Sequence, residues 1–247
     1  IVDALRLDFM TAPLDPDGEA LMPRMHELLQ RNATQTRLFG FCADPPTVTA
    51  QRLKGLTAGS LPTFVDIGAN FNSSEVLEDT WLTQLRQRRD STHSTSDVFM
   101  GDDTWLELFP GRFEKALPFP SFDTHDLHTV DDGIEAAMLP TLLHDRDNDV
   151  GKRGTLWDVF VAHFLGVDHI GHTHHAWHPL MAPRLNRMDR LLSEVAEALP
   201  SDALLLVFGD HGMSDDGNHG GASREETDSG LFVYSKEPFD LAPDTEW

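Results

Sequence analysis

The sequence is poor in cysteine, in basic side chains and in long apolar runs. Its single cysteine, Cys42, excludes an internal disulfide framework. Only 19 lysine and arginine side chains stand against 41 aspartate and glutamate side chains, which gives a net charge of −22 with histidine neutral. This charge argues against nucleic acid or an anionic membrane surface as the main partner, because phosphates would be repelled.

No stretch of the sequence is long and apolar enough for a transmembrane helix. The run at the strongest predicted strand, Ala203–Phe208, is far shorter than the roughly 20 residues that a span requires. The sequence has no signal peptide, and Ile1–Asp3 has the pattern of a strand that is already ending. We therefore expect residues 1–247 to form one domain, a fragment of a longer protein, with a sizeable core.

Apolar runs and helical patterns alternate along the chain. Strands are predicted at Leu38–Cys42, Asp97–Met100, Thr155–Leu165, Leu204–Phe208 and Leu231–Tyr234. Helices are predicted at Gly18–Gln30, Thr47–Leu56, Val76–Arg88, Val130–Leu139 (with Pro140 near its end) and Pro183–Leu199, and Phe109–Phe122 is predicted to be an irregular loop. This alternation favours an α/β fold whose mostly parallel central sheet is flanked by helices.

An aspartate and two histidines follow the strongest predicted strand. Asp210 and His211 come directly after it, and His219 lies eight residues beyond His211. Carboxylates and imidazoles at the carboxyl ends of strands are what a metal site in an open α/β sheet needs. This segment therefore predicts a metal site.

The same combination of side chains occurs at two other predicted strand ends. Asp3 follows the short strand at the start of the chain, and Asp168 and His172 follow the strand at 155–165. Asp168 and His172 are four residues apart, so one helical turn or a tight loop can direct both side chains at one ion. The three strand ends together supply six candidate ligands.

The six side chains divide into two ligand sets, Asp3, Asp210 and His211 in one, and Asp168, His172 and His219 in the other. Neither set contains a thiolate, which favours Zn²⁺ or Mn²⁺ in an open catalytic site over a closed structural zinc. Two such ions about 3.5–4 Å apart bind a phosphoryl group for an in-line displacement. The sequence therefore predicts chemistry at phosphorus.

Two hydroxyl groups stand just before a predicted helix. In Asp44-Pro45-Pro46-Thr47-Val48-Thr49, either threonine is a candidate nucleophile. The N-terminus of a helix offers free N–H groups and a positive dipole end to a phosphoryl oxygen. An isolated threonine at such a place is more often only an N-cap, so the residues alone leave the choice open.

Other polar side chains have simpler interpretations. Asp102 and Asp103, which precede Trp105, are either a capping pair or a contact to substrate. His163 lies inside a predicted strand and is expected to be a packed or hydrogen-bonded core residue rather than a metal ligand.

Five segments of the sequence resemble one enzyme family. These are VDALRLDF, DPPTVTAQRLKGLTAGSLPTFVDIG, FMGDDTW, GVDHIGHTHH and GDHGMSDDGNHGG, which together are spread over nearly all of the chain. They are similar to the lumenal catalytic domain of the GPI ethanolamine phosphate transferases, the class that acts on the third mannose. This class belongs to the phosphodiesterase and phosphotransferase branch of the alkaline phosphatase superfamily.

The resemblance implies an alkaline-phosphatase-like fold with two zinc ions. One ion would be bound by Asp3, Thr47, Asp210 and His211, and the other by Asp168, His172 and His219. Thr47 would be the nucleophile, with Thr49 as the alternative. Phosphoethanolamine would move from phosphatidylethanolamine to Thr47 and then to a mannose hydroxyl of the GPI precursor. Asp102 or Asp103 would contact the ethanolamine ammonium.

The resemblance also implies a location. The family is held in the endoplasmic reticulum membrane by segments absent from this chain, with the catalytic domain in the lumen, and it allows a membrane partner subunit. Two glycosylation sequons, at Asn32 and Asn72, are compatible with a lumenal domain.

Two competing functions use the same residues. A metal-dependent phosphodiesterase or phosphatase would keep the metals and the nucleophile and use water as the acceptor. A metal-stabilised binding domain without activity would need a broken site, whereas all seven expected positions carry suitable residues.

Overall fold

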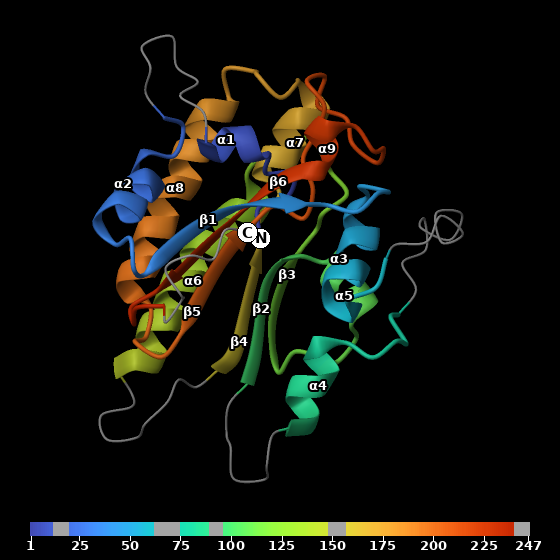
Figure 1. Ribbon diagram of the computed structural model, residues 1–247. Helices are drawn as coiled ribbons and strands as arrows, with labels where there is room; N and C mark the ends of the chain where they lie inside the picture. Colours follow the sequence, from blue (N-terminus) through green and yellow to red (C-terminus); the bar gives the residue numbers. More distant parts are fainter. Residues whose placement is uncertain (12–19, 62–74, 89–95, 148–156, 240–247) are drawn as a thin grey trace.

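A computed structural model describes residues 1–11, 20–61, 75–88, 96–147 and 157–239 (Figure 1). The sequon at Asn72 and the predicted strand start at Thr155–Leu156 lie outside the described residues, as do Gly18 and Glu19 of the first predicted helix.

The strands form two three-stranded sheets. In one sheet, β6 (Asp228–Ser235) lies between β1 (Thr36–Cys42) and β5 (Leu204–Phe208) and runs antiparallel to both. In the other, β2 (Ser96–Asp102) lies between β3 (Lys115–Phe119) and β4 (Trp157–His163) and runs parallel to both. The predicted α/β class is confirmed, and β6 is the strand that departs from the parallel arrangement.

The first three residues join the two sheets. Val2 N donates to Phe208 O of β5 at 3.0 Å, while Asp3 N donates to Phe164 O, just past β4, at 2.9 Å. An apolar cavity of about 730 Å³ reaches from this junction along β4 and β5, and side chains of α6 and α8 also line it. The sheets are therefore connected at the end where the candidate ligands lie.

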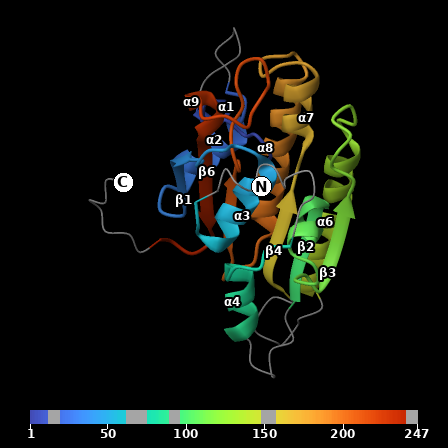
Figure 2. The same cartoon turned by 90° about the vertical axis from the view of Figure 1, so that its right-hand side faces the viewer.

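Helices cover both faces of the sheets (Figures 1 and 2). One group consists of α1 (Leu7–Thr11), α2 (Pro23–Arg31), α6 (Thr129–Asp147), α7 (Gly166–Thr173) and α8 (Met181–Ala198). The other consists of α3 (Thr49–Ala58), α4 (Trp81–Arg88) and α5 (Thr104–Leu108), and the short α9 (Arg224–Thr227) precedes β6.

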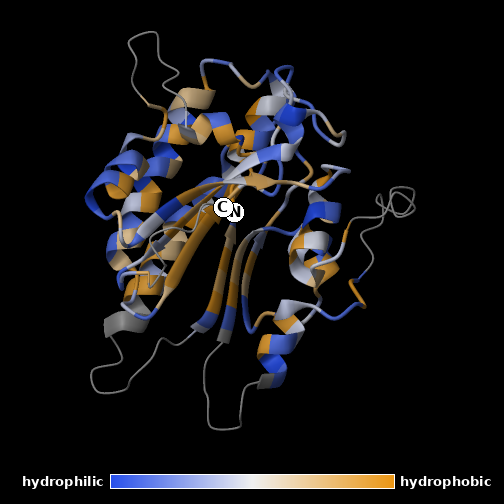
Figure 3. Cartoon of the chain, viewed as in Figure 1, coloured by the Kyte–Doolittle hydropathy of each residue, from blue (hydrophilic) through white to orange (hydrophobic). Residues whose placement is uncertain are grey.

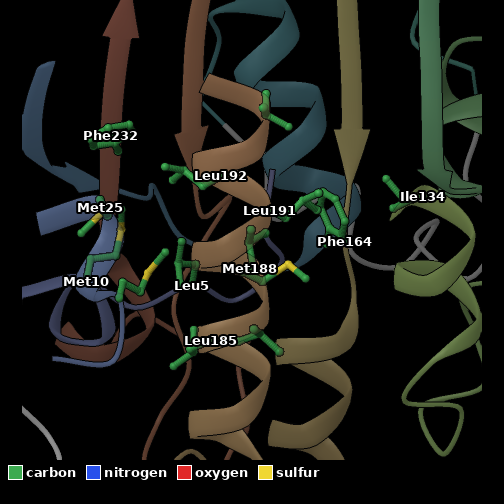
Figure 4. Packing of buried hydrophobic residues seen from close by; sticks show 14 of the residues in the cluster. Leu5, Met10, Met25, Ile134, Phe164, Leu185, Met188, Leu191, Leu192 and Phe232 are labelled. Carbon is green, nitrogen blue, oxygen red and sulfur yellow. The ribbon is translucent and has the colours of Figure 1, made fainter. Parts of the chain in front are cut away.

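Each group of helices packs on its own core cluster. Along β2, Val98 and Met100 belong to the cluster beneath α6 and α8, whereas Phe99 belongs to the cluster beneath α3 and α5. This alternation follows from the two-residue period of a strand. Apolar residues accordingly run along the strands in Figure 3, and Figure 4 shows α8 side chains in the centre of the larger cluster.

Three predictions along the chain were clearly wrong. The helix predicted over Val76–Arg88 begins only at Trp81. The helix predicted to end near Pro140 continues to Asp147, because Met138 and Leu142 on either side of the proline are both buried in the core. Tertiary packing here outweighs the hydrogen bond that proline removes. The predicted loop at 109–122 contains β3, an edge strand whose exposed side chains gave no apolar pattern. Pro118 is tolerated because an edge strand leaves some N–H positions unpaired.

Within the described ranges, no helix combines the length and the apolar character that crossing a membrane requires.

Replacing Leu185 by alanine tests the larger core cluster. Leu185 is fully buried in α8, so Leu185→Ala should lower the free energy of unfolding by about 2–5 kcal/mol. Arg190→Ala on the exposed side of the same helix should change it by less than about 0.5 kcal/mol. Chemical denaturation measures both, and equal effects of the two substitutions would contradict this assignment of the core.

Candidate metal centre and active site

The candidate ligands converge where the two sheets join. Asp210 and His211 directly follow β5, and Asp3 follows the Ile1–Val2 segment that bonds to both sheets. Asp168 and His172 lie one turn apart in α7, which directly follows β4. The topology thus brings together side chains that the sequence places far apart.

Two contacts fix the position of α7. The Asp131 carboxylate of α6 accepts from Leu165 N at 3.0 Å and from Gly166 N at 3.1 Å, which satisfies donors at the start of the helix. At the other end, Gly171 allows the loop after β5 to approach closely. A Cβ atom at Gly171 would lie only 2.6 Å from the Met213 sulfur. The loop can therefore bring His219 to the side chains of α7.

The first ligand group consists of Asp3, Asp210 and His211. His211 Nε2 lies 3.3 Å from Asp3 Oδ1 and 3.4 Å from Asp210 Oδ2. All three side chains are buried. The predicted first set of protein ligands, apart from the threonine, thus lies within reach of one ion.

The second ligand group consists of Asp168, His172 and His219. Asp168 Oδ1 lies 3.4 Å from His172 Nε2 and 3.2 Å from His219 Nε2. The rings of His219 and His211 stack with their centroids 4.1 Å apart, so the two groups are direct neighbours. The six candidate ligands thus form two adjacent groups.

Backbone carbonyls orient two of the imidazoles. His211 Nδ1 donates to Gly212 O at 2.7 Å, and His219 Nδ1 donates to Thr47 O at 2.7 Å. With the hydrogen on Nδ1, the Nε2 lone pair of each ring is available to a metal ion.

The carboxylates show that these residues fit a metal ion. Asp3 Oδ1, Asp168 Oδ1 and Asp210 Oδ2 are buried and have no hydrogen-bond partner among the residues that the structure describes. Buried polar atoms are normally paired, and an isolated buried carboxylate is costly. A divalent cation in each group would satisfy these oxygens, which match the oxygen and nitrogen ligands that zinc accepts.

Burial and mutual repulsion shift the pKa values of the cluster. Burial raises the pKa of Asp3 well above its ordinary value, and the carboxylates of Asp210 and Asp168 raise it further. Burial lowers the pKa of His211 to about 4. Burial opposes the ionisation of Asp168 and His219, yet their mutual attraction lowers the pKa of Asp168 to about 2 and raises that of His219 to about 9.

Thr49, rather than Thr47, presents its hydroxyl to the first ligand group. Thr49 Oγ1 lies 3.3 Å from Asp3 Oδ2 and 3.3 Å from His211 Nε2. It is the first residue of α3 and is only partly buried. The helix starts two residues later than predicted, and this shift puts Thr49 at the helix N-terminus.

Thr47 holds the loop that carries His219. Its hydroxyl accepts from Gly220 N at 2.9 Å and donates to Gly221 O at 3.0 Å, and the residue is fully buried. The preference for Thr47 as nucleophile therefore has no support from the geometry. Its hydroxyl and its backbone carbonyl both form hydrogen bonds with the loop.

Asp102 and Asp103 make structural contacts. Asp102 is buried and accepts from Thr104 N at 2.8 Å, while Asp103 Oδ1 accepts from the Ser121 hydroxyl at 2.6 Å. Asp102 thus satisfies an N–H at the start of α5, whereas Asp103, the N-cap residue, makes no side-chain capping bond.

His163 is buried as expected, but it also contacts the site. Its Nε2 lies 3.4 Å from Asp3 Oδ2, which the sequence analysis did not foresee. The sequence placed His163 near the end of a predicted strand, but nothing in the local pattern indicates its contact with Asp3.

The family model described as type I phosphodiesterase / nucleotide pyrophosphatase matches residues 17–220. The chain belongs to this family. Its matched range contains every candidate ligand except Asp3.

Relatives with higher similarity carry a more specific name. GPI ethanolamine phosphate transferase 3, catalytic subunit, of Homo sapiens is 45% identical over 244 residues, which are 95% of this chain and 21% of that protein. GPI ethanolamine phosphate transferase 3 of Saccharomyces cerevisiae is 37% identical over 246 residues, 96% of this chain and 23% of that protein. The chain thus spans about a fifth of the length of these curated relatives.

Solved structures confirm the alkaline-phosphatase-like fold. The C-terminal periplasmic domain of EcEptC from Escherichia coli, in complex with Zn, gives a TM-score of 0.60 at 11% identity, covering 96% of this chain and 71% of that chain. An alkaline phosphatase superfamily protein from Vibrio parahaemolyticus gives 0.55 at 11% identity, covering 96% and 59%.

The Asp168–His219 pair predicts an unusual histidine titration in protein treated with a chelator. NMR should find the His219 ring half-protonated near pH 9, and Asp168→Asn should lower that midpoint. Because the folded pKa lies above the ordinary 6.5, the pair stabilises the fold fully below pH 6.5 and loses this contribution as the pH rises through about 9. The ion pair would be contradicted by a His219 midpoint near 6.5 that is the same in the unaltered protein and in Asp168→Asn.

Proposed function

We propose that this chain is the catalytic domain of an ethanolamine phosphate transferase with two zinc ions. Asp3, Asp210, His211 and the Thr49 hydroxyl hold one ion, and Asp168, His172 and His219 hold the other. The names of the relatives and the zinc bound to the structurally similar periplasmic domain support this proposal. Mn²⁺ is the alternative ion, since it accepts the same ligand types.

One observation carries the proposal: a partly exposed threonine at a helix N-terminus lies beside two adjacent groups of candidate ligands. The Thr49 hydroxyl donates to Asp3 Oδ2 at 3.3 Å, and the stacked rings of His211 and His219 connect the two groups. A nucleophile, an acceptor for its proton and two cation sites are the components of phosphoryl transfer through a covalent intermediate.

The first half of the reaction forms a bond between Thr49 Oγ and the phosphorus of phosphatidylethanolamine. The hydroxyl proton passes along its hydrogen bond to Asp3 Oδ2. The bond from phosphorus to the diacylglycerol oxygen breaks, and that oxygen takes up a proton as diacylglycerol leaves. Phosphoethanolamine remains on the threonine.

The second half transfers phosphoethanolamine to a mannose hydroxyl of the GPI precursor. The hydroxyl oxygen forms the new bond to phosphorus and gives up its proton, the bond to Thr49 Oγ breaks, and Thr49 regains a proton. Bound zinc would supply positive charge that favours the threonine alkoxide and offsets charge on the phosphoryl oxygens. The N-terminus of α3 adds its partial positive charge at the same place.

We propose a location from the family that the names of the relatives indicate. We place the domain in the lumen of the endoplasmic reticulum as part of a membrane-bound glycoprotein, with a GPI glycolipid as acceptor and room for a membrane partner subunit. Asn32 of the first sequon lies at the end of α2, where its side chain amide donates to Gln35.

Threonine substitutions distinguish the two candidate nucleophiles. Thr49→Ala should abolish the phosphoethanolamine adduct that intact-protein mass spectrometry detects, and Thr49→Ser should retain it. Thr47→Ala should still form the adduct, more slowly, because it loosens the loop that holds His219. If the Thr49→Ala protein still forms the adduct and the Thr47→Ala protein does not, Thr47 is the nucleophile.

The acceptor determines whether the enzyme is a transferase or a hydrolase. With labelled phosphatidylethanolamine, a mannoside acceptor should take up the label and should deplete the Thr49 adduct faster than buffer alone. Zinc removal with a chelator should stop both half-reactions, and added zinc should restore them. Release of free phosphoethanolamine at the same rate with and without the mannoside would favour a phosphodiesterase that uses water.

A further inference from the structure

His163 is a buried histidine that the proposed reaction leaves without a role. It ends β4, is fully buried, and its Nε2 lies 3.4 Å from Asp3 Oδ2. In the described part of the chain Nε2 makes no hydrogen bond of regular geometry, and the Asp3 carboxylate is the acceptor that lies beside it. A buried polar atom in this state, directed at a candidate metal ligand, calls for an explanation.

Trp105 determines which nitrogen of His163 carries the hydrogen. The indole Nε1–H donates to His163 Nδ1 at 3.0 Å. An indole N–H is only a donor, so Nδ1 must be the acceptor and the hydrogen of the neutral ring lies on Nε2. His163 therefore presents a donor to Asp3.

The packing around the Trp105 indole fixes the position of the N–H that bonds His163 Nδ1. Its ring packs against Phe99, Phe109 and Phe113, with centroid distances of 5.7, 5.5 and 6.0 Å. Gly101 allows β2 to approach β4 closely, because a Cβ atom there would lie 2.2 Å from His163 O. Both members of the pair are therefore fixed relative to Asp3.

The two oxygens of Asp3 have different surroundings. Thr49 Oγ1 and His163 Nε2 both lie beside Oδ2, at 3.3 and 3.4 Å. Oδ1 lies on the side of His211 Nε2, at 3.3 Å, and lacks a hydrogen-bond partner among the described residues. Donors thus gather on one oxygen and leave the other for an ion.

We propose that Trp105 and His163 are positioning residues that orient the Asp3 carboxylate, so that Oδ1 is presented to the metal ion and Oδ2 to Thr49. This inference rests on the proposed role of Asp3 as a ligand. Hydrogen bonds to a ligating carboxylate fix its orientation and strengthen metal binding. The Asp102 carboxylate also lies near His163, with its Oδ2 3.5 Å from Nδ1.

A third metal site is the competing interpretation, since Asp3, Asp102 and His163 are also close enough to share an ion. Metal binding through His163 Nε2 would require the hydrogen on Nδ1, where it would collide with the hydrogen donated by Trp105. The observed hydrogen bond therefore favours a donor over a ligand, and metal stoichiometry separates the two.

Zinc affinity tests the proposal without relying on catalysis. Zinc bound per protein and the affinity of each site are measured by competition with a chromophoric chelator, using Asp3→Asn and His172→Ala to assign the two sites. We expect two ions in the unaltered protein. His163→Phe should weaken the site that contains Asp3 by about 10–100-fold and leave the other unchanged. His163→Gln, which keeps a donor, should restore most of the loss.

Two further variants separate positioning from stability. Trp105→Phe removes the indole N–H and should weaken the same zinc site, whereas Phe113→Leu disturbs the packing around Trp105 and should lower the melting temperature without changing zinc affinity. Unchanged affinity in both His163→Phe and Trp105→Phe would overturn the proposal. Three ions, one of them lost in His163→Phe, would make His163 a ligand. No zinc in the unaltered protein would overturn the proposed function itself.

Discussion

Three aspartates, Asp3, Asp168 and Asp210, are buried together at one end of the two sheets, and their mutual repulsion is the constraint around which the site is built. Burial removes the water that would stabilise their charges, and the carboxylates of Asp210 and Asp168 add to the cost of ionising Asp3. His219 offsets one charge through its ion pair with Asp168. The remaining unpaired oxygens make the cluster a poor structural core and a good cation site.

Much of the surrounding structure serves to hold this cluster. Arg6 is buried and donates to Met213 O at 3.1 Å and to Asp215 Oδ1 at 2.9 Å, which ties the loop after β5 to the start of the chain. The Ser229 hydroxyl lies within hydrogen-bond distance of both Leu5 O (2.7 Å) and Gly209 O (3.0 Å), where the loop begins. The loop that carries His219 is therefore anchored at several points.

Sequence reasoning could group the candidate ligands because they all lie in segments that come after strand ends. Asp210 and His211, and likewise Asp168 and His172, are close in sequence, so local patterns were sufficient. The nucleophile was harder, because Thr47 and Thr49 differ only in where α3 begins, and helix boundaries depend on tertiary contacts. The role of His163 was out of reach, since it depends on contacts between Asp3, β4 and α5 that no local pattern records.

The division of the ligands between the sheets has a mechanical consequence. Asp168 and His172 follow β4, while His219 belongs to the loop after β5, and β4 and β5 share no ladder in the described residues. A cation held by these three side chains would add a cross-link between two sheets that already share the hydrogen bonds of Ile1–Asp3 and the larger core cluster. Sliding one sheet along the other by a single residue, about 3.3 Å, would pull the ligands apart. Resistance of the fold to shear and occupancy of the second site are therefore coupled.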